Sequence, residues 1–217
     1  GMNSIGIQSS GGVGLMLSQW IDQRHIPADL LDVDVRRLQP FQSNRRYLRD
    51  RTSETLGLLY AMHWPWRQYA TARDVRRSPF HDRLLPQRAV MAEQSGWERP
   101  GWFAPSGVER AYRYSWGQQN WFEHTGAECR RVRDAVALFD QSCFAKYLVT
   151  GRNALAVLNR VSANQIDVPV GRVVYTQWLN ERGGIEADLT VTRTGETEFL
   201  VVTTAAGQAR ATARLCA

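Results

Sequence analysis

Residues 172–204 read RVVYTQWLNERGGIEADLTVTRTGETEFLVVTT, and this stretch decides the fold. Residues 172–180, 185–193 and 198–204 are strand-like runs, and in residues 185–193 apolar side chains alternate with polar ones, as in a half-buried strand. The tetrapeptide ERGG separates the first two runs, and the tripeptide TGE begins the break between the next two. Both breaks are typical of hairpin turns. The stretch therefore predicts three antiparallel strands in a meander.

The residues before and after this meander predict helices and one further strand. Residues 126–140 predict an amphipathic helix, whose apolar face consists of Cys129, Val132, Val136 and Phe139. Residues 142–150 predict a strand, after which Gly151 turns the chain and Asn153 can cap a second helix. The apolar face of that helix consists of Leu155, Leu158 and Val161. With a closing Ala/Arg helix at residues 205–217, the order predicts an α+β domain rather than a doubly wound parallel sheet.

Residues 28–105 are less regular, because prolines interrupt every long periodic segment. Helices are predicted at residues 43–57, with an extension to about residue 60, and at residues 86–94. Tryptophans, tyrosines and arginines alternate in this region, a mixture also found in platforms that bind single-stranded nucleic acid. Their uneven spacing favours a core or a protein interface instead. We therefore expect no nucleic-acid partner.

Glycines are concentrated near the start, where residues 3–14 read NSIGIQSSGGVG. We expect a glycine-rich loop followed by a helix over residues 15–23. Such a loop has the features of a phosphate cradle, since its backbone N–H groups and the helix N-terminus attract anions. The segment contains neither GxGxxG nor GK[ST], so the residues alone favour a flexible loop leading into the helix.

Composition limits the classes of protein that remain. The 217 residues are 43% hydrophobic and 22% charged, which is ordinary for a globular chain and excludes disorder as a description of the whole. No apolar run approaches the ~20 residues of a membrane helix, so no membrane partner is expected. The three cysteines and four histidines show no metal-binding spacing, and unpaired cysteines favour a reduced, cytoplasmic protein. The net charge of +6 suits an anionic small molecule, a nucleic acid or an acidic surface.

One pair of side chains could carry chemistry. In the run at residues 185–193, Asp188 lies on the polar face together with Glu186, Thr190 and Thr192. Tyr175 lies on the preceding run, and in an antiparallel hairpin of suitable register it shares a face with Asp188. A phenol ring beside a carboxylate suits a flat, nitrogen-bearing heterocycle. The alternative is an exposed strand face with a solvated aspartate and a packing tyrosine.

Several motifs also resemble a known family. Residues 133–151 (RDAVALFDQSCFAKYLVTG) and 174–193 (VYTQWLNERGGIEADLTVTR) resemble two signatures of the glycine-cleavage T-protein, an aminomethyltransferase. Upstream, NSIGI, GGVG, RRSP and WFAP resemble the dimethylglycine/sarcosine dehydrogenase group. In that group an FAD-dependent amine-oxidising module precedes a T-protein-like module that binds folate.

The resemblance implies a division of the chain into three parts. Residues 1–35 would be the end of the FAD module, residues 36–105 the central segment of the oxidoreductase, and residues 106–217 the N-terminal half of the folate module. The chain would then be an internal fragment, without the Rossmann-like region and without the second folate half. It also implies that Gly11, Gly12 and Gly14 contact FAD in an intact protein. We expect no FAD on the fragment.

The resemblance further assigns roles in the folate site. Asp188 matches the family aspartate that reaches the reacting nitrogen of tetrahydrofolate, and Tyr175 matches the tyrosine that holds the pterin. Two departures are Ala187, where the family commonly has a second acid, and Thr192, where the transferases have an aromatic residue.

The implied function is oxidation of an N-methyl amine followed by capture of the one-carbon unit as 5,10-methylenetetrahydrofolate. Alone, the chain is expected to lack dehydrogenase activity and to bind folate weakly or not at all. The alternative is a catalytically inactive module that forms a homodimer or another assembly to cover its truncated core.

Overall fold

The computed structural model describes residues 5–25, 30, 33, 35 and 38–216. Residues 3 and 4 of the first upstream motif, and residue 217 of the predicted last helix, lie outside the described residues. The chain divides into two compact units, Gly1–Leu38 and Gln39–Ala217. The division at residues 35 and 105 implied by the family resemblance stays a prediction.

The first unit contains the helix α1 (Gly6–Gln23). The predicted glycine-rich loop is therefore wrong over residues 6–14, which are helical. A Cβ at any of its four glycines would meet no atom within 4 Å, and none of them has a positive φ, so nothing requires a turn there. The hydroxyls of Ser10 and Ser18 add hydrogen bonds to the carbonyls of Ile7 and Leu15. Glycine lowers helix stability by about 1 kcal/mol per residue relative to alanine but does not forbid the conformation.

The second unit begins with a short 3-10 helix and the helix α2, followed by a three-stranded sheet. The helices are η2 (Pro40–Ser43), α2 (Arg45–Leu58), α3 (His81–Leu84) and α4 (Phe122–Asp134). The strands are β1 (Arg76–Arg77), β2 (Ala89–Gln94) and β3 (Trp97–Phe103), in the order β1-β3-β2. The predicted helix at residues 43–57 is confirmed as α2, which Asn44 caps by accepting two backbone N–H bonds.

The predicted helix at residues 86–94 is wrong, because most of this segment forms β2. Ser95 and Gly96 both have positive φ, at 52° and 81°. Two such residues form the two-residue turn whose twist suits a hairpin, and they pair Gln94 with Trp97 across β2 and β3. The dipeptide Ser95-Gly96 is the sequence signal for this hairpin.

The predicted helix at residues 126–140 is correct in kind but wrong in its bounds, since α4 ends at Asp134. Ala135 is extended, and the Asp140 carboxylate accepts the backbone N–H of Ser142 at 3.0 Å. This local bond stabilises a turn that competes with helix continuation. Val136 and Phe139, expected on a helical face, are instead 97% and 64% exposed.

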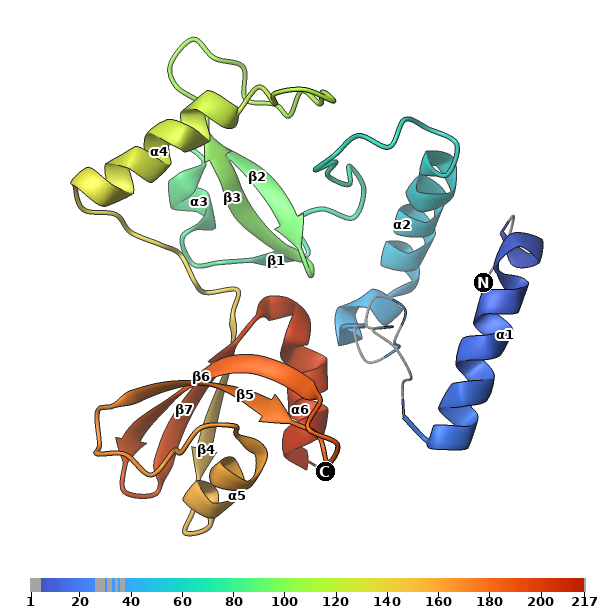
Figure 1. The fold of residues 1–217 in the computed structure, drawn as a ribbon. Coiled ribbons are helices and arrows are strands. Elements are labelled where there is room, and N and C mark those ends of the chain that lie inside the picture. Colours follow the sequence, from blue (N-terminus) through green and yellow to red (C-terminus); the bar gives the residue numbers. More distant parts are fainter. Residues whose placement is uncertain (1–4, 26–29, 31–32, 34, 36–37, 217) are drawn as a thin grey trace. The chain divides into compact units, whose positions relative to one another are not determined.

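The four-stranded sheet confirms the predicted meander. Its strands are β4 (Ala145–Thr150), β5 (Val173–Leu179), β6 (Ile185–Gly195) and β7 (Glu198–Thr203), in the order β4-β7-β6-β5. All three pairings are antiparallel, and the sheet forms the lower part of the view in Figure 1. The α+β class is thus established.

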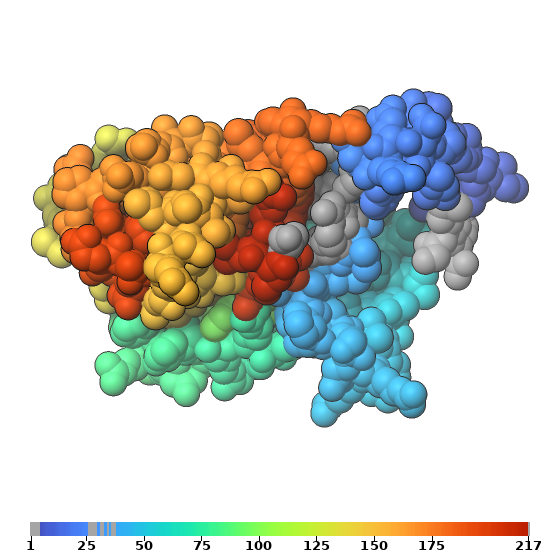
Figure 2. Space-filling view, turned by 90° about the horizontal axis from the view of Figure 1, so that it is seen from below, coloured from blue at the N-terminus to red at the C-terminus, as the bar shows by residue number. Residues whose placement is uncertain are grey.

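Two helices pack against one face of this sheet, and both are visible on the side of the molecule that Figure 2 presents. They are α5 (Ala154–Val161) and α6 (Gln208–Cys216), the latter preceded by the 3-10 helix η3 (Ala205–Gly207). The core between helices and sheet consists of Ala154, Leu158, Ile166, Trp178, Leu189, Val191, Phe199, Val201 and Ala211. Asn153 occupies the predicted N-cap position of α5, but its side chain makes no capping hydrogen bond.

Candidate functional site

The opposite face of the four-stranded sheet carries both predicted site residues. Tyr175 is paired with Thr190 across β5 and β6, and Gln177 is paired with Asp188. Because side chains alternate along a strand, all four of these side chains lie on one face. Of the registers that the sequence left open, the structure has the one that places Tyr175 and Asp188 on a common face.

Tyr175 and Asp188 are also in direct contact. The Tyr175 hydroxyl donates a hydrogen bond to Oδ2 of Asp188 at 2.9 Å. This bond, together with the charge of the carboxylate, raises the pKa of Tyr175 because ionisation would place two negative groups side by side. Tyr175 is 60% exposed, so its ring is accessible from solvent. The pair therefore presents an aromatic surface and a carboxylate acceptor to the same open space.

The packed side of the sheet holds these residues in place. Thr176, Trp178 and Leu189 alternate with the site residues along β5 and β6, and all three are buried. The Thr203 hydroxyl on β7 donates to the backbone carbonyl of Asp188 at 2.7 Å. The position of the Asp188 carboxylate is thus fixed by its strand neighbours, whereas its side chain remains exposed.

Glu186 does not join the site, contrary to the alternation that placed it beside Asp188. An irregularity between Trp178 and Leu179 shifts the register, so that Leu179 is paired with Ile185. The Glu186 carboxylate instead pairs with Arg210 of α6 at 2.7 Å. Simple alternation cannot predict such a bulge, because one extra residue changes which face the next side chain occupies.

The glycines expected to contact FAD lie in the interior of α1. In an α-helix the N–H groups of Gly11, Gly12 and Gly14 are engaged by carbonyls of the preceding turn, so they form no anion cradle. The residues present therefore do not fit a phosphate-binding loop, and their contact with FAD stays a prediction. Among the described residues, no group of three or more histidine, cysteine or acidic side chains could hold a metal ion.

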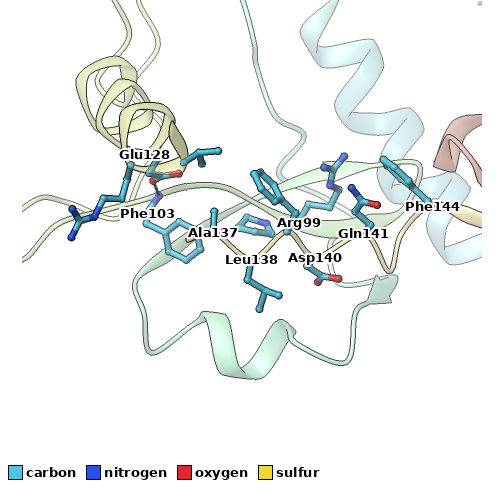
Figure 3. Close-up of a pocket in the computed structure, with 12 residues that line it drawn as sticks. Arg99, Phe103, Glu128, Ala137, Leu138, Asp140, Gln141 and Phe144 are labelled. Atoms are coloured by element: carbon cyan, nitrogen blue, oxygen red, sulfur yellow. Dashed lines mark hydrogen bonds between the residues drawn. The ribbon is translucent and has the colours of Figure 1, made fainter. Parts of the chain in front are cut away.

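A separate cavity of about 390 Å³ lies between β3, α4 and the extended segment after α4. Its lining includes Pro100, Phe103, Glu128, Val132, Leu138, Phe139 and Phe144. Glu128 accepts the backbone N–H of Phe103, and Figure 3 shows Leu138 directed away from this pair. Sequence reasoning missed this cavity because it treated residues 135–139 as helix.

Comparison with known proteins establishes the family. Residues 80–216 match the family model described as the GCVT N-terminal domain, and residues 25–78 match the FAD dependent oxidoreductase central domain. The chain belongs to the GCVT N-terminal domain family, with a segment of the oxidoreductase central domain before it. Within the described residues, no helix is long and apolar enough to cross a membrane.

Individual relatives agree with this assignment. The 4-methylaminobutanoate oxidase (formaldehyde-forming) of Paenarthrobacter nicotinovorans is 44% identical over 99% of this chain and 26% of its own length. The mitochondrial sarcosine dehydrogenase of Homo sapiens is 33% identical over 89% of this chain and 24% of its own length. The mitochondrial pyruvate dehydrogenase phosphatase regulatory subunit of Mus musculus is 34% identical over 93% of this chain and 24% of its own length. The chain thus spans about a quarter of the curated relatives it matches.

Among solved structures, the glycine cleavage system aminomethyltransferase T from Bartonella henselae matches with a TM-score of 0.49 and 22% identity. The match covers 65% of this chain and 34% of that chain.

Proposed function

We propose that this chain is the folate-facing part of a protein that oxidises N-methyl amines and captures the one-carbon unit on tetrahydrofolate. The observation that carries the proposal is the Tyr175–Asp188 hydrogen bond on the open face of the four-stranded sheet. A flat, nitrogen-bearing heterocycle is the chemical class that such a pair suits. The names of the amine oxidase and amine dehydrogenase relatives support the choice of amine chemistry.

Each residue of the pair has a distinct role in this proposal. Tyr175 would pack its exposed ring on the pterin, while its hydroxyl holds Oδ2 of Asp188. An ionised carboxylate has about four lone-pair positions on two oxygens, so Asp188 can accept a ligand N–H as well as the phenol. Tetrahydrofolate, when bound, would supply the amine nitrogen that receives the one-carbon unit. The net charge of +6 suits its anionic glutamyl tail.

Contact of Gly11, Gly12 and Gly14 with FAD in an intact protein stays a prediction. Because these helical glycines form no phosphate cradle, we expect neither FAD binding nor dehydrogenase activity from the chain alone. We likewise propose an internal fragment containing half of a folate site, whose affinity for folate is weak.

The test is a titration of the chain with folinic acid, followed by tyrosine and backbone NMR signals. We expect millimolar binding, with shifts concentrated at Tyr175 and its strand neighbours, and further weakening in Asp188→Asn. Val173→Ala, on the same face and 59% exposed, is the matched control and should bind like the parent chain. Absence of any shift at Tyr175 at the highest folinic acid concentration contradicts the folate assignment. Micromolar binding lost in Asp188→Ala contradicts the incomplete-site part of the proposal.

A second candidate is an assembly module, which a specific observation favours. Val136, Leu138 and Phe139 are 97%, 87% and 64% exposed, and the last two line the cavity beside α4. Exposed apolar groups of this density are typical of interfaces. One relative is named a regulatory subunit rather than an enzyme.

We propose a homodimer as the form this assembly takes, and light scattering tests it. A mass that doubles with concentration and returns to the monomer value in Leu138→Ser supports the dimer. A monomer at every concentration excludes it.

We further propose a reducing, cytoplasmic location, with folate rather than nucleic acid as the partner of the basic charge. The support for the compartment is that all three cysteines are free, with Cys143 buried. Retention on single-stranded DNA that falls steeply with salt would contradict the choice of folate over nucleic acid.

A further inference from the structure

A third polar side chain lies on the same face as the Tyr175–Asp188 pair. Gln177 lies directly opposite Asp188 in the register of β5 and β6. It also lies two residues after Tyr175 on β5, so its side chain emerges from the same face. Opposed residues in such a pair have Cβ atoms about 4.5–5.5 Å apart, within reach of an amide and a carboxylate. Gln177 is only partly exposed.

The Tyr175 hydroxyl has one proton to donate and oxygen lone pairs with which to accept. Its proton goes to Oδ2 of Asp188. A hydrogen-bonding interaction with the Gln177 side chain acts on the same hydroxyl and lowers the pKa of Tyr175, against the larger raising effect of Asp188. A donor to the phenol oxygen has this effect, because it stabilises the ionised form.

We propose that Gln177 is a positioning residue, whose amide N–H donates to the Tyr175 oxygen and keeps the phenol proton directed at Asp188. The inference rests on the proposed function, in which Tyr175 and Asp188 face folate. With its oxygen occupied on one side, the hydroxyl has a single orientation in which both hydrogen bonds are made. The ring is then held for stacking, and part of the Asp188 carboxylate is left for a ligand N–H.

A merely solvated glutamine makes a different prediction. Exposed side chains without fixed partners contribute little, and replacing one with a similar shape leaves its neighbours unchanged. Gln177→Met keeps the length of the side chain and removes the amide donor, so it separates the two cases. Gln177→Glu removes the donor and adds a negative charge beside Asp188, which gives a second variant.

The test is an NMR titration of the full chain carrying ¹³Cζ-labelled tyrosine, in which Tyr175→Phe assigns the signal. If the Gln177 amide donates to the Tyr175 oxygen, the pH at the midpoint of the Tyr175 titration rises in Gln177→Met and rises further in Gln177→Glu. This midpoint falls in Asp188→Asn, because the hydrogen bond to the Asp188 carboxylate is the largest cause of the raised pKa of Tyr175. Val173→Thr, also on β5, is the matched control and leaves the midpoint unchanged. An unchanged midpoint in both Gln177 variants, with the other tyrosine signals native, overturns the inference.

The titration does not use folate, so the two proposals fail in different ways. We expect folinic acid to bind Gln177→Met about 2-fold to 10-fold more weakly than the parent chain, the value of one net hydrogen bond. A shifted midpoint without folate binding in any variant contradicts the proposed function and supports the positioning role. Folate binding with an unshifted midpoint contradicts the positioning role alone.

Discussion

The two sheets of the second unit are stabilised by different interactions. The four-stranded sheet buries one apolar face against α5 and α6, where Trp178, Val191, Phe199 and Val201 are fully buried. The three-stranded sheet has a smaller apolar cluster, built on Val90, Trp102 and Ala104. It depends in addition on ion pairs, in which Glu98 pairs with Arg73 and Glu93 pairs with Arg51.

This difference explains where the candidate site lies. A sheet packed on one face by apolar side chains leaves its other face free for polar groups held in a fixed register. Tyr175, Gln177 and Asp188 use that freedom. In the three-stranded sheet the charged groups are themselves part of the packing, since Glu98 accepts from both the Arg73 side chain and the Asp74 backbone. Its carboxylates are therefore engaged in structure.

The largest effect is expected from Trp178→Ala, because the four-stranded sheet depends on its apolar face. Trp178 is 0% exposed, and removing a buried tryptophan costs about 3–5 kcal/mol. Urea unfolding followed by circular dichroism measures this loss. Val173→Ala on the open face of the same strand should change stability by less than about 0.5 kcal/mol. Equal losses in the two variants would mean that both faces of β5 are packed.

The same distinction explains how much of the fold the sequence could predict. Every strand of the four-stranded sheet was predicted: alternation identified β4 and β6, and the hairpin signals on either side of β6 identified β5 and β7. Strands β2 and β3 were not predicted, because their buried positions include charged residues such as Glu98 and because Pro100 interrupts β3. The shortened α4 was missed because the apolar pattern continues through residues 135–139, whereas the helix ends at Asp134.

The candidate site was predictable to a similar extent. Alternation placed Tyr175 and Asp188 on one face in one of two possible registers, and the structure has that register and adds their direct hydrogen bond. Gln177 was missed, because its role follows from the register opposite Asp188, which the hairpin's bulge sets. Glu186 was misplaced for the same reason. Pairing register is a tertiary property, and one extra residue in a bulge is enough to change it.

A smaller effect is expected from Glu98→Gln, which tests the ion pairs of the three-stranded sheet. The Glu98 side chain is 2% exposed and the Arg73 side chain 26%, so the variant leaves a partly buried guanidinium without its counter-charge. Removing one partner of a fully buried pair costs 3–5 kcal/mol, and partial exposure of Arg73 reduces the expected loss to about 2 kcal/mol. Urea unfolding measures it. An unchanged midpoint would contradict the structural role of this pair.

Two glycines with similar backbone angles compare the hairpins of the two sheets. Gly96 in the β2–β3 turn has φ +81°, and Gly183 before β6 has φ +79°. A Cβ at Gly183 would meet nothing within 4 Å, whereas a Cβ at Gly96 would lie 2.5 Å from the Phe41 ring. Gly183→Ala should therefore cost only the left-handed backbone penalty of about 1 kcal/mol, and Gly96→Ala more than that. Thermal unfolding of both variants measures the difference, and equal shifts would show that the Phe41 ring moves aside freely.

The smallest effect is expected at Asp140, which lies in the segment between α4 and β4 and forms hydrogen bonds with Ser78 and Ser142. Partial burial by itself would raise the pKa of Asp140, but hydrogen bonds from Ser78 and Ser142 together lower it from its ordinary value of 3.8. A carboxyl whose folded-state pKa is depressed stabilises the fold above its unfolded pKa, and this contribution is lost as pH falls through the folded value. Asp140→Asn should thus be less stable than the parent chain at pH 6, and the difference should shrink below about pH 4 as the parent loses its charge. Urea unfolding at pH 6, 4 and 3 measures both chains. A difference that stays constant over this range would mean that the hydrogen bonds from the two serines do not depend on the charge of Asp140.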